Sequence, residues 1–169
     1  MSWFNTLRKK TQSSTDVTGS ILYDEKSFYN RFTHDLLEAK EEVIIESPYI
    51  TGRRMSLFRP IFKKLTSRGV KVYVMTRDPK EHDMPLEYQS EAEIRNFESI
   101  GVQTLLCLGN HHRKLAILDR KVLWEGSLNI LSQARSREIM RRIDSRKLSE
   151  EMFRFLNYNK LGFKKTLMI

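Results

Sequence analysis

The sequence has little of what marks a secreted or membrane-spanning protein. Its 169 residues include one cysteine, Cys107, so no disulfide can form within the chain, and a reducing, intracellular setting is expected. No apolar run approaches the roughly 20 residues that a transmembrane helix needs. The first residues, MSWFN, do not resemble a signal peptide. We therefore expect a cytoplasmic protein without a transmembrane segment.

Several common site patterns are also missing. The sequence has no Gly-rich phosphate loop, no obvious pair of catalytic carboxylates and no nucleophile elbow. Cys107, His111 and His112 lie close together, but their spacing matches no common zinc pattern, and His34 and His82 are distant in the sequence. The sequence therefore predicts no metal site and no other cofactor.

What is present is typical of one basic globular domain. Hydrophobic residues make up 40% and charged residues 30% of a chain long enough for one substantial core. We expect an N-terminal arm over residues 1–20 and a single domain over 21–169, because no repeat or linker divides the chain. The net charge of +9 favours a polyanionic partner, nucleic acid first and an anionic membrane surface second.

Apolar spacing predicts an alternation of helices and strands. Helices are expected from Asp24 or Ser27 to Lys40, over 55–68, from Ser90 or as early as Pro85 to Ile100, and over 148–158; strands are expected over 43–45, 70–76 and 102–108. This rhythm is typical of an α/β protein with a mixed β-sheet flanked by helices. Tyr49 and Thr51, which follow the first of these strands, are candidates for substrate contact, although packing is the simpler role for Tyr49.

The stretch from His112 to Asn129 is the densest in chemically useful residues. Two short apolar runs, 115–118 and 122–124, flank a turn and predict a hairpin. Side chains alternate along a strand, so His112 and Lys114 are expected on one face of the first strand. Gly126 would then let the backbone approach a ligand closely.

These residue types suit phosphodiester chemistry. The neutral imidazole of His112 can attack phosphorus and form a covalent phosphohistidine, which divides one difficult displacement into two easier ones. The ammonium of Lys114, the hydroxyl of Ser127 and the amide of Asn129 can stabilise charge on the non-bridging oxygens without a metal.

The pattern HxKxxxxDxxxxxxGSxN resembles the signature of the phospholipase D superfamily, the HKD motif. Every position is filled, by His112, Lys114, Asp119, Gly126, Ser127 and Asn129. The resemblance implies a phospholipase D-like half-domain and a metal-independent phosphodiesterase. It also implies that Glu138 orients the imidazole of His112 and that Asp119, counted with the catalytic set, has a structural role.

Members of this superfamily build one active site from two HKD motifs, and this chain carries one. One histidine attacks, and a second must protonate the leaving oxygen as general acid. The resemblance therefore predicts a homodimer, in which a two-fold axis supplies His112 twice. The bacterial single-motif nucleases of the family resemble this arrangement.

An arginine-rich stretch follows the motif, and its simplest interpretation is a solvated face. Because it lies downstream of a candidate phosphate site, we also expect contacts to a nucleic-acid backbone from Arg135, Arg137, Arg141 and Arg142. The leading hypothesis is a nuclease, with DNA expected ahead of RNA as its nucleic-acid partner. A phospholipid hydrolase or transferase using the same residues, and a non-catalytic nucleic-acid-binding module, are the alternatives.

Overall fold

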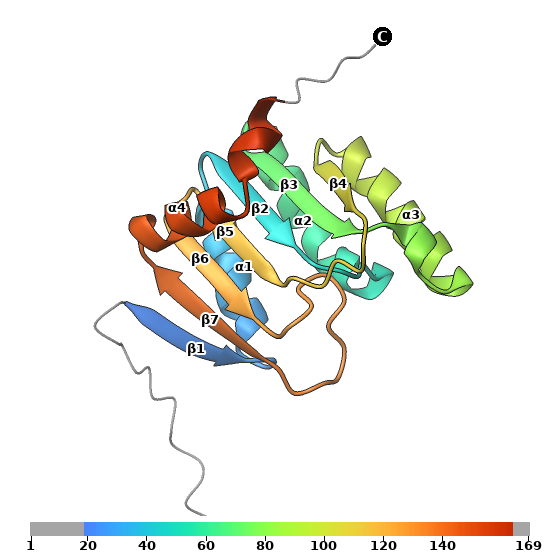
Figure 1. Cartoon of the computed structure of the whole chain (residues 1–169), viewed down its shortest axis with the longest axis horizontal. Coiled ribbons are helices and arrows are strands. Elements are labelled where there is room, and N and C mark those ends of the chain that lie inside the picture. The colour runs from blue at the N-terminus through green and yellow to red at the C-terminus, as the bar shows by residue number, and fades with distance from the viewer. Residues whose placement is uncertain (1–18, 164–169) are drawn as a thin grey trace, which may run out of the picture.

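The computed structural model describes residues 19–163, which form one mixed β-sheet between two layers of helices (Figure 1). The strands are β1 (Ser20–Asp24), β2 (Glu42–Glu46), β3 (Lys71–Arg77), β4 (Gln103–Cys107), β5 (Leu115–Leu118), β6 (Val122–Gly126) and β7 (Ile139–Asp144). The α-helices are α1 (Phe28–Glu38), α2 (Gly52–Ser67), α3 (Met84–Ser99) and α4 (Arg146–Phe155), and two 3₁₀ turns are η1 (Pro79–Glu81) and η2 (Tyr158–Phe163).

The order of the strands is β1-β7-β6-β5-β2-β3-β4. Strands β2, β3 and β4 are parallel, whereas β5 runs antiparallel to both β2 and β6, and β7 runs antiparallel to both β6 and β1. Glu46 at the end of β2 therefore pairs with Leu115 at the start of β5, which pairs with Glu125 near the end of β6. The segment before β5 and the segment after β6, which carry all of the HKD motif except Asp119, meet at this edge of the sheet, the lower edge in Figure 1.

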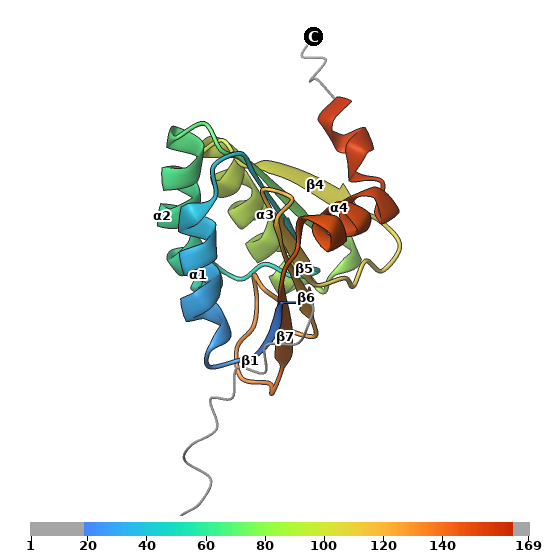
Figure 2. The same ribbon diagram turned by 90° about the vertical axis from the view of Figure 1, so that its left-hand side faces the viewer.

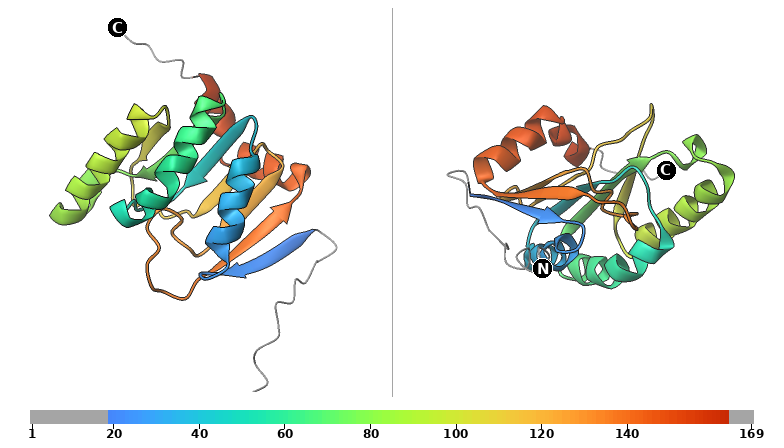
Figure 3. Two further views of the ribbon diagram at one scale, coloured as in Figure 1. Left: turned by 180° about the vertical axis from the view of Figure 1, so that it is seen from behind. Right: turned by 90° about the horizontal axis from the view of Figure 1, so that it is seen from below.

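Helices α1, α2 and α3 cover one face of the sheet, and α4 lies on the other (Figure 2 and Figure 3). The larger core lies under α1 and α2 and is rich in aromatic rings, with Trp124 of β6 fully buried. A smaller core lies under α4 and η2 around Ile117 and Phe153. Strands β2 and β5 bury both of their faces, which explains why they appear in the sequence as continuous apolar runs.

The predicted α/β class, a mixed sheet flanked by helices, is confirmed. Helix α2 begins at Gly52, earlier than expected, and α3 begins at Met84, close to the earlier of its two expected starts. Strands β1 and β7 were not predicted. The arginine pair in the middle of β7 hides its period, because Arg142 is buried through ion pairing rather than through apolar character. The expected N-terminal arm lies, apart from residues 19 and 20, outside the described residues.

Candidate active site

His112 and Lys114 lie at the sheet edge just before β5, in residues 108–114, which are in neither a helix nor a strand. The expected strand placement is therefore wrong, but the two side chains do lie together. The Nζ of Lys114 is 2.7 Å from Nδ1 of His112 and also donates a hydrogen bond to the His112 carbonyl oxygen. Both residues line a pocket of about 450 Å³, together with Gly126 and Arg141.

Ser127 and Glu138 lie at the start and the end of the loop between β6 and β7. The Ser127 hydroxyl donates a hydrogen bond to Glu138 Oε2 and accepts one from the Ile139 amide at 3.2 Å. Gly126 is required here for a reason other than ligand approach, because an added Cβ would lie 2.2 Å from the Ile139 carbonyl oxygen. The glycine lets β7 pass close to β6, and that contact places Ser127 beside Glu138.

Glu138 was expected to orient the imidazole of His112. Its carboxylate is hydrogen-bonded to Ser127, while Nδ1 of His112 faces Lys114. Burial lowers the pKa of Lys114, and the nearby charge of Glu138 opposes this shift. The structure thus brings Glu138 to the Ser127 and Lys114 side of the site, and its role toward His112 stays a prediction.

Asn129 lies in the same loop, where its carbonyl oxygen accepts hydrogen bonds from the amides of Ser132 and Gln133. These bonds close a turn that holds the residue in place. The side-chain Oδ1 is buried and has no hydrogen-bond partner among the described residues. A buried acceptor without a partner is costly, so the amide retains hydrogen-bonding capacity that a ligand can use.

Asp119 lies at the opposite end of β5 from His112. Its carboxylate accepts hydrogen bonds from the backbone amides of Lys40, Glu41 and Glu42 at 2.8 to 3.0 Å. Its φ of 50° is in the left-handed region, which aspartate tolerates better than other bulky residues do. Asp119 therefore ties the β5–β6 turn to the start of β2 and lies away from the other motif residues.

The four arginines of the expected nucleic-acid surface separate into two groups. Arg135 and Arg137 are exposed in the β6–β7 loop, and Arg141 lines the pocket. Arg142 is buried, with its Nε 2.7 Å from Asp35 and its Nη1 3.2 Å from Asp144. This guanidinium is committed to the core, so the expectation for Arg142 does not fit its position.

Tyr49 borders the site, whereas Thr51 serves the loop. The ring of Tyr49 lies 6.4 Å from that of His112 and 5.2 Å from that of His82, centroid to centroid. Both ring nitrogens of His82 are buried without a partner among the described residues, and burial lowers its pKa. Thr51 precedes α2, and its amide donates to the Leu131 carbonyl oxygen at 3.0 Å.

Glu46, at the end of β2, is the residue that sequence reasoning missed. Its side chain is fully buried and ion-paired with Arg113, with His111 beside it. His111 lies against Glu46, whereas the next residue, His112, contacts Lys114. The signal available in the sequence was a glutamate directly after the apolar run of residues 43–45.

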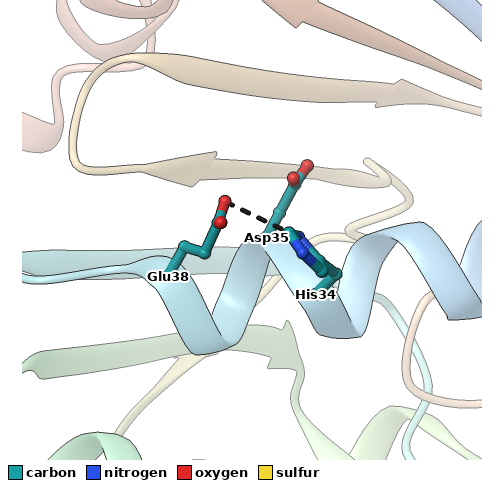
Figure 4. Close-up of side chains that lie close together, drawn as sticks. All are labelled: His34, Asp35 and Glu38. Carbon is teal, nitrogen blue, oxygen red and sulfur yellow. Dashed lines mark ion pairs between the residues drawn. The ribbon is translucent and has the colours of Figure 1, made fainter.

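One cluster of possible metal ligands occurs among the described residues, on α1, where His34, Asp35 and Glu38 lie close together (Figure 4). His34 is exposed and lies 3.6 Å from Glu38. The oxygens of Asp35 already accept from Arg31, Arg142 and the Trp124 indole. Because these donors occupy the buried carboxylate, the cluster is explained by helix-to-sheet packing.

None of the helices within residues 19–163 combines the length and the apolar character needed to cross a bilayer. The cytoplasmic location expected from the sequence stays a prediction.

Comparisons with known proteins agree with this geometry. Residues 32–158 match the family model described as "Cardiolipin synthase, PLD-like domain". NucT from Helicobacter pylori has a TM-score of 0.64 at 22% identity, over 82% of this chain and 93% of NucT. Nuc from Salmonella typhimurium, a phospholipase D family member, has a TM-score of 0.64 at 16% identity, over 80% of this chain and 91% of Nuc.

A phosphatidylserine synthase from Haemophilus influenzae has a TM-score of 0.59 at 14% identity, over 82% of this chain and 38% of the synthase. No curated protein sequence gives a significant match. At these identities the structural neighbours show the fold, whereas the family model covers well over half of the sequence. The chain belongs to the phospholipase D superfamily, through a PLD-like domain.

Proposed function

We propose that this protein is a metal-independent phosphodiesterase that cleaves nucleic acid, with DNA the first candidate substrate, through a covalent phosphohistidine at His112. The observation that carries the proposal is the contact between His112 and Lys114 at the edge of a pocket of about 450 Å³. A nucleophile and a cation held together in this way suit attack on a phosphodiester. The matches to NucT and Nuc cover 93% and 91% of those chains, and this likeness supports a nuclease over other members of the superfamily.

The first step forms a bond between Nε2 of His112 and phosphorus and breaks the bond from phosphorus to the leaving oxygen. Nε2 can attack only if it carries the lone pair, which requires the proton of the neutral ring to be on Nδ1. Lys114 faces Nδ1 in the structure. An ammonium donates to a ring nitrogen with a free lone pair, so in this contact the ring proton is on Nε2. Binding of a phosphate is expected to draw the ammonium to a non-bridging oxygen and to let the ring proton move to Nδ1, where Glu138, which lies near Lys114, can accept a hydrogen bond from it.

The leaving oxygen takes a proton from a second histidine, and in the second step water, deprotonated by that histidine, displaces phosphate from Nε2. One HKD motif per chain means that a second copy supplies this group, so we propose a homodimer with a shared site. Leu22 and Ile139, which line the same pocket, are 50% and 60% exposed. Apolar side chains exposed beside a pocket are typical of a surface that a partner covers.

Affinity for the polyanion would come from charge rather than from sequence-specific contacts. Arg135 and Arg137 are exposed on the loop that carries Ser127 and Asn129, and the chain has a net charge of +9. Contacts between arginine and phosphate release counterions, so binding should weaken steeply as salt rises.

A phospholipid substrate is the second candidate. It is favoured by the description of the matching family model and by the likeness to phosphatidylserine synthase, because the same residues can attack a lipid phosphodiester. A non-catalytic nucleic-acid-binding module is the third, and the complete motif argues against it, since binding alone has no need of a nucleophile.

The test incubates the purified protein, in EDTA, with labelled single- and double-stranded DNA, with RNA and with phosphatidylcholine vesicles. We expect cleavage of DNA by the wild type, and a loss of about 10³-fold or more in His112→Ala. His34→Ala, which removes an exposed histidine on α1, is the matched control and should keep full activity.

Activity that survives in His112→Ala, or that is lost on chelation, would contradict the mechanism. Turnover of vesicles without cleavage of nucleic acid would establish the lipid alternative, and binding without turnover would favour the third. Sedimentation of the wild type as a monomer at concentrations where it is active would exclude the shared site.

A further inference from the structure

The carboxylate of Glu46 is buried at the end of β2, directly beside the segment that carries His112, and its side chain has no exposed surface. Arg113 donates a hydrogen bond to each carboxylate oxygen of Glu46, from Nε to Oε2 at 2.6 Å and from Nη2 to Oε1 at 3.0 Å. The hydroxyl of Tyr158, in η2, donates to Oε1. Nε2 of His111 lies 3.4 Å from Oε2.

A buried carboxylate is costly unless its partners replace the lost hydration. Arg113 and Tyr158 do so, whereas Nε2 of His111 makes no hydrogen bond within the described residues. Burial alone would lower the pKa of Arg113, but its hydrogen bonds and charge pairing with Glu46 outweigh this and raise it. Burial raises the pKa of Tyr158, and the charge of Glu46 raises it further. The hydroxyl therefore keeps its proton and remains a donor.

The residues that contact Glu46 alternate with the residues of the candidate site. His111 and Arg113 contact Glu46, whereas His112 and Lys114, which alternate with them in the sequence, contact each other. When Arg113 is held to a buried carboxylate, its neighbours in the sequence, His112 and Lys114, are directed to the other side of the segment. The orientation of His112 thus depends on Glu46 without any contact between the two being needed.

The segment needs such an anchor because regular structure does not supply one between β4 and β5. Its first half is held by Glu81, whose oxygens accept from the amides of Gly109 and Asn110 at 2.8 and 3.1 Å. Arg77 donates to the Asn110 side chain at 2.8 Å. Its second half, which carries the candidate nucleophile, is held through Glu46.

We propose that Glu46 is a positioning residue for the reaction, acting through Arg113 on the orientation of His112. This inference rests on the proposed function. Rates of displacement are sensitive to placement, and a misplacement of about 1 Å can cost about 10²-fold. Glu46 does not itself line the pocket, although its partner Arg113 does. Because its removal leaves every pocket-lining residue in place, it should reduce turnover more than substrate binding.

The test compares Glu46→Gln with Glu42→Gln at the other end of the same strand. Glu42 is a matched control because its Oε1 lies 2.6 Å from Nε of Arg120, the same type of ion pair at the same distance. Glu46→Gln should fold, since the side chain of Arg113 is 50% exposed and its guanidinium can be hydrated when the pair is lost. We expect kcat on DNA to fall by about 10- to 100-fold with KM changed by less than about 2-fold. Glu42→Gln should keep the kcat of the wild type.

Two further measurements separate positioning from general stability. If Glu46 acts through Arg113, then Arg113→Ala should add little to the loss of kcat in Glu46→Gln, and a double-mutant cycle shows this as strong coupling. Amide hydrogen exchange over residues 108–114 should speed up in Glu46→Gln and stay unchanged in Glu42→Gln.

A Glu46→Gln variant that loses stability but keeps its kcat would overturn the inference, as would equal losses of kcat in the two glutamate variants. Additive effects in the cycle would also count against it. A wild type that cleaves no substrate would overturn the proposed function. If amide exchange over residues 108–114 is unchanged in Glu46→Gln, Glu46 does not anchor this segment, whatever the wild type cleaves.

Discussion

The two ends of the β2–β5 strand pair are held by similar chemistry with different consequences. Each end has a glutamate of β2, Glu42 or Glu46, ion-paired with an arginine that flanks β5, Arg120 or Arg113. At the Glu42 end, Asp119 also binds three backbone amides and closes a tight turn. At the Glu46 end, the carboxylate accepts hydrogen bonds from two side chains, those of Arg113 and Tyr158, and faces an irregular segment.

The two ends of this strand pair are expected to contribute differently, one to stability and the other to function. The hydrogen bonds that Asp119 accepts from backbone amides tie the turn after β5 to the start of β2. Hydrogen bonds from a carboxylate to side chains fix only the segment that carries those side chains. Breaking the Asp119 end should therefore cost folding free energy, and breaking the Glu46 end should cost turnover.

The largest effect on stability is expected from Asp119→Ala, which removes three charge-assisted hydrogen bonds at once. It also places alanine at a φ of 50°, where it is less tolerated than aspartate. We expect the free energy of unfolding in urea to fall by about 2–4 kcal/mol, while the folded enzyme keeps its kcat.

Asp119→Asn provides the control, since asparagine tolerates the left-handed region and retains one side-chain acceptor. It should lose roughly half as much stability as Asp119→Ala. A large fall in kcat in either variant, at a temperature where it is fully folded, would contradict the separation of the two ends.

Tyr158→Phe should have a smaller effect, because it removes one donor from Glu46 and keeps the ring that packs on Phe153. We expect a loss of about 1 kcal/mol in unfolding free energy. The fall in kcat should be smaller than the fall in Glu46→Gln. Arg120→Ala, at the other end, should cost no more than about 1 kcal/mol because its pair is partly exposed. A kcat that falls in Arg120→Ala but not in Tyr158→Phe would reverse the comparison.

The smallest effect is expected from the solvent-accessible carboxylate of Glu81, which holds the same segment from outside. The amides of Gly109 and Asn110 lower its pKa from the ordinary value of 4.5. A pKa that is lower in the folded state contributes stability above the unfolded value, and this contribution is lost as pH falls through the folded value. The stability difference between wild type and Glu81→Gln, measured in urea, should thus shrink as pH falls below 4.5. A difference that stays constant from pH 6 to pH 3 would exclude this linkage.

Much of the fold was predictable because its central strands are buried on both faces. The apolar runs of β2, β3 and β5 and the apolar spacing of α1 and α2 are local signals. Strand β7 gave no such signal, since Arg142 is buried only because Asp35, far away in the sequence, meets it.

The candidate site divides in the same way. His112 and Lys114 were predicted to lie together because their spacing in the motif is local, although the backbone between them is not a strand. The partners of Glu46 are 67 and 112 residues away, so its role follows only from the fold. Gly126 was expected to face a ligand, but the constraint on it comes from β7, which sequence reasoning did not place.

The hydrogen bond from Tyr158 has a consequence for how this domain can be cut or fused. A fragment that ended at β7 would contain the whole HKD motif and all seven strands of the described sheet. It would nevertheless lack α4 and the Tyr158 hydroxyl, which donates a hydrogen bond to Glu46. A fragment designed to keep all the described contacts of Glu46 must therefore extend past Tyr158, well beyond the last residue of the motif.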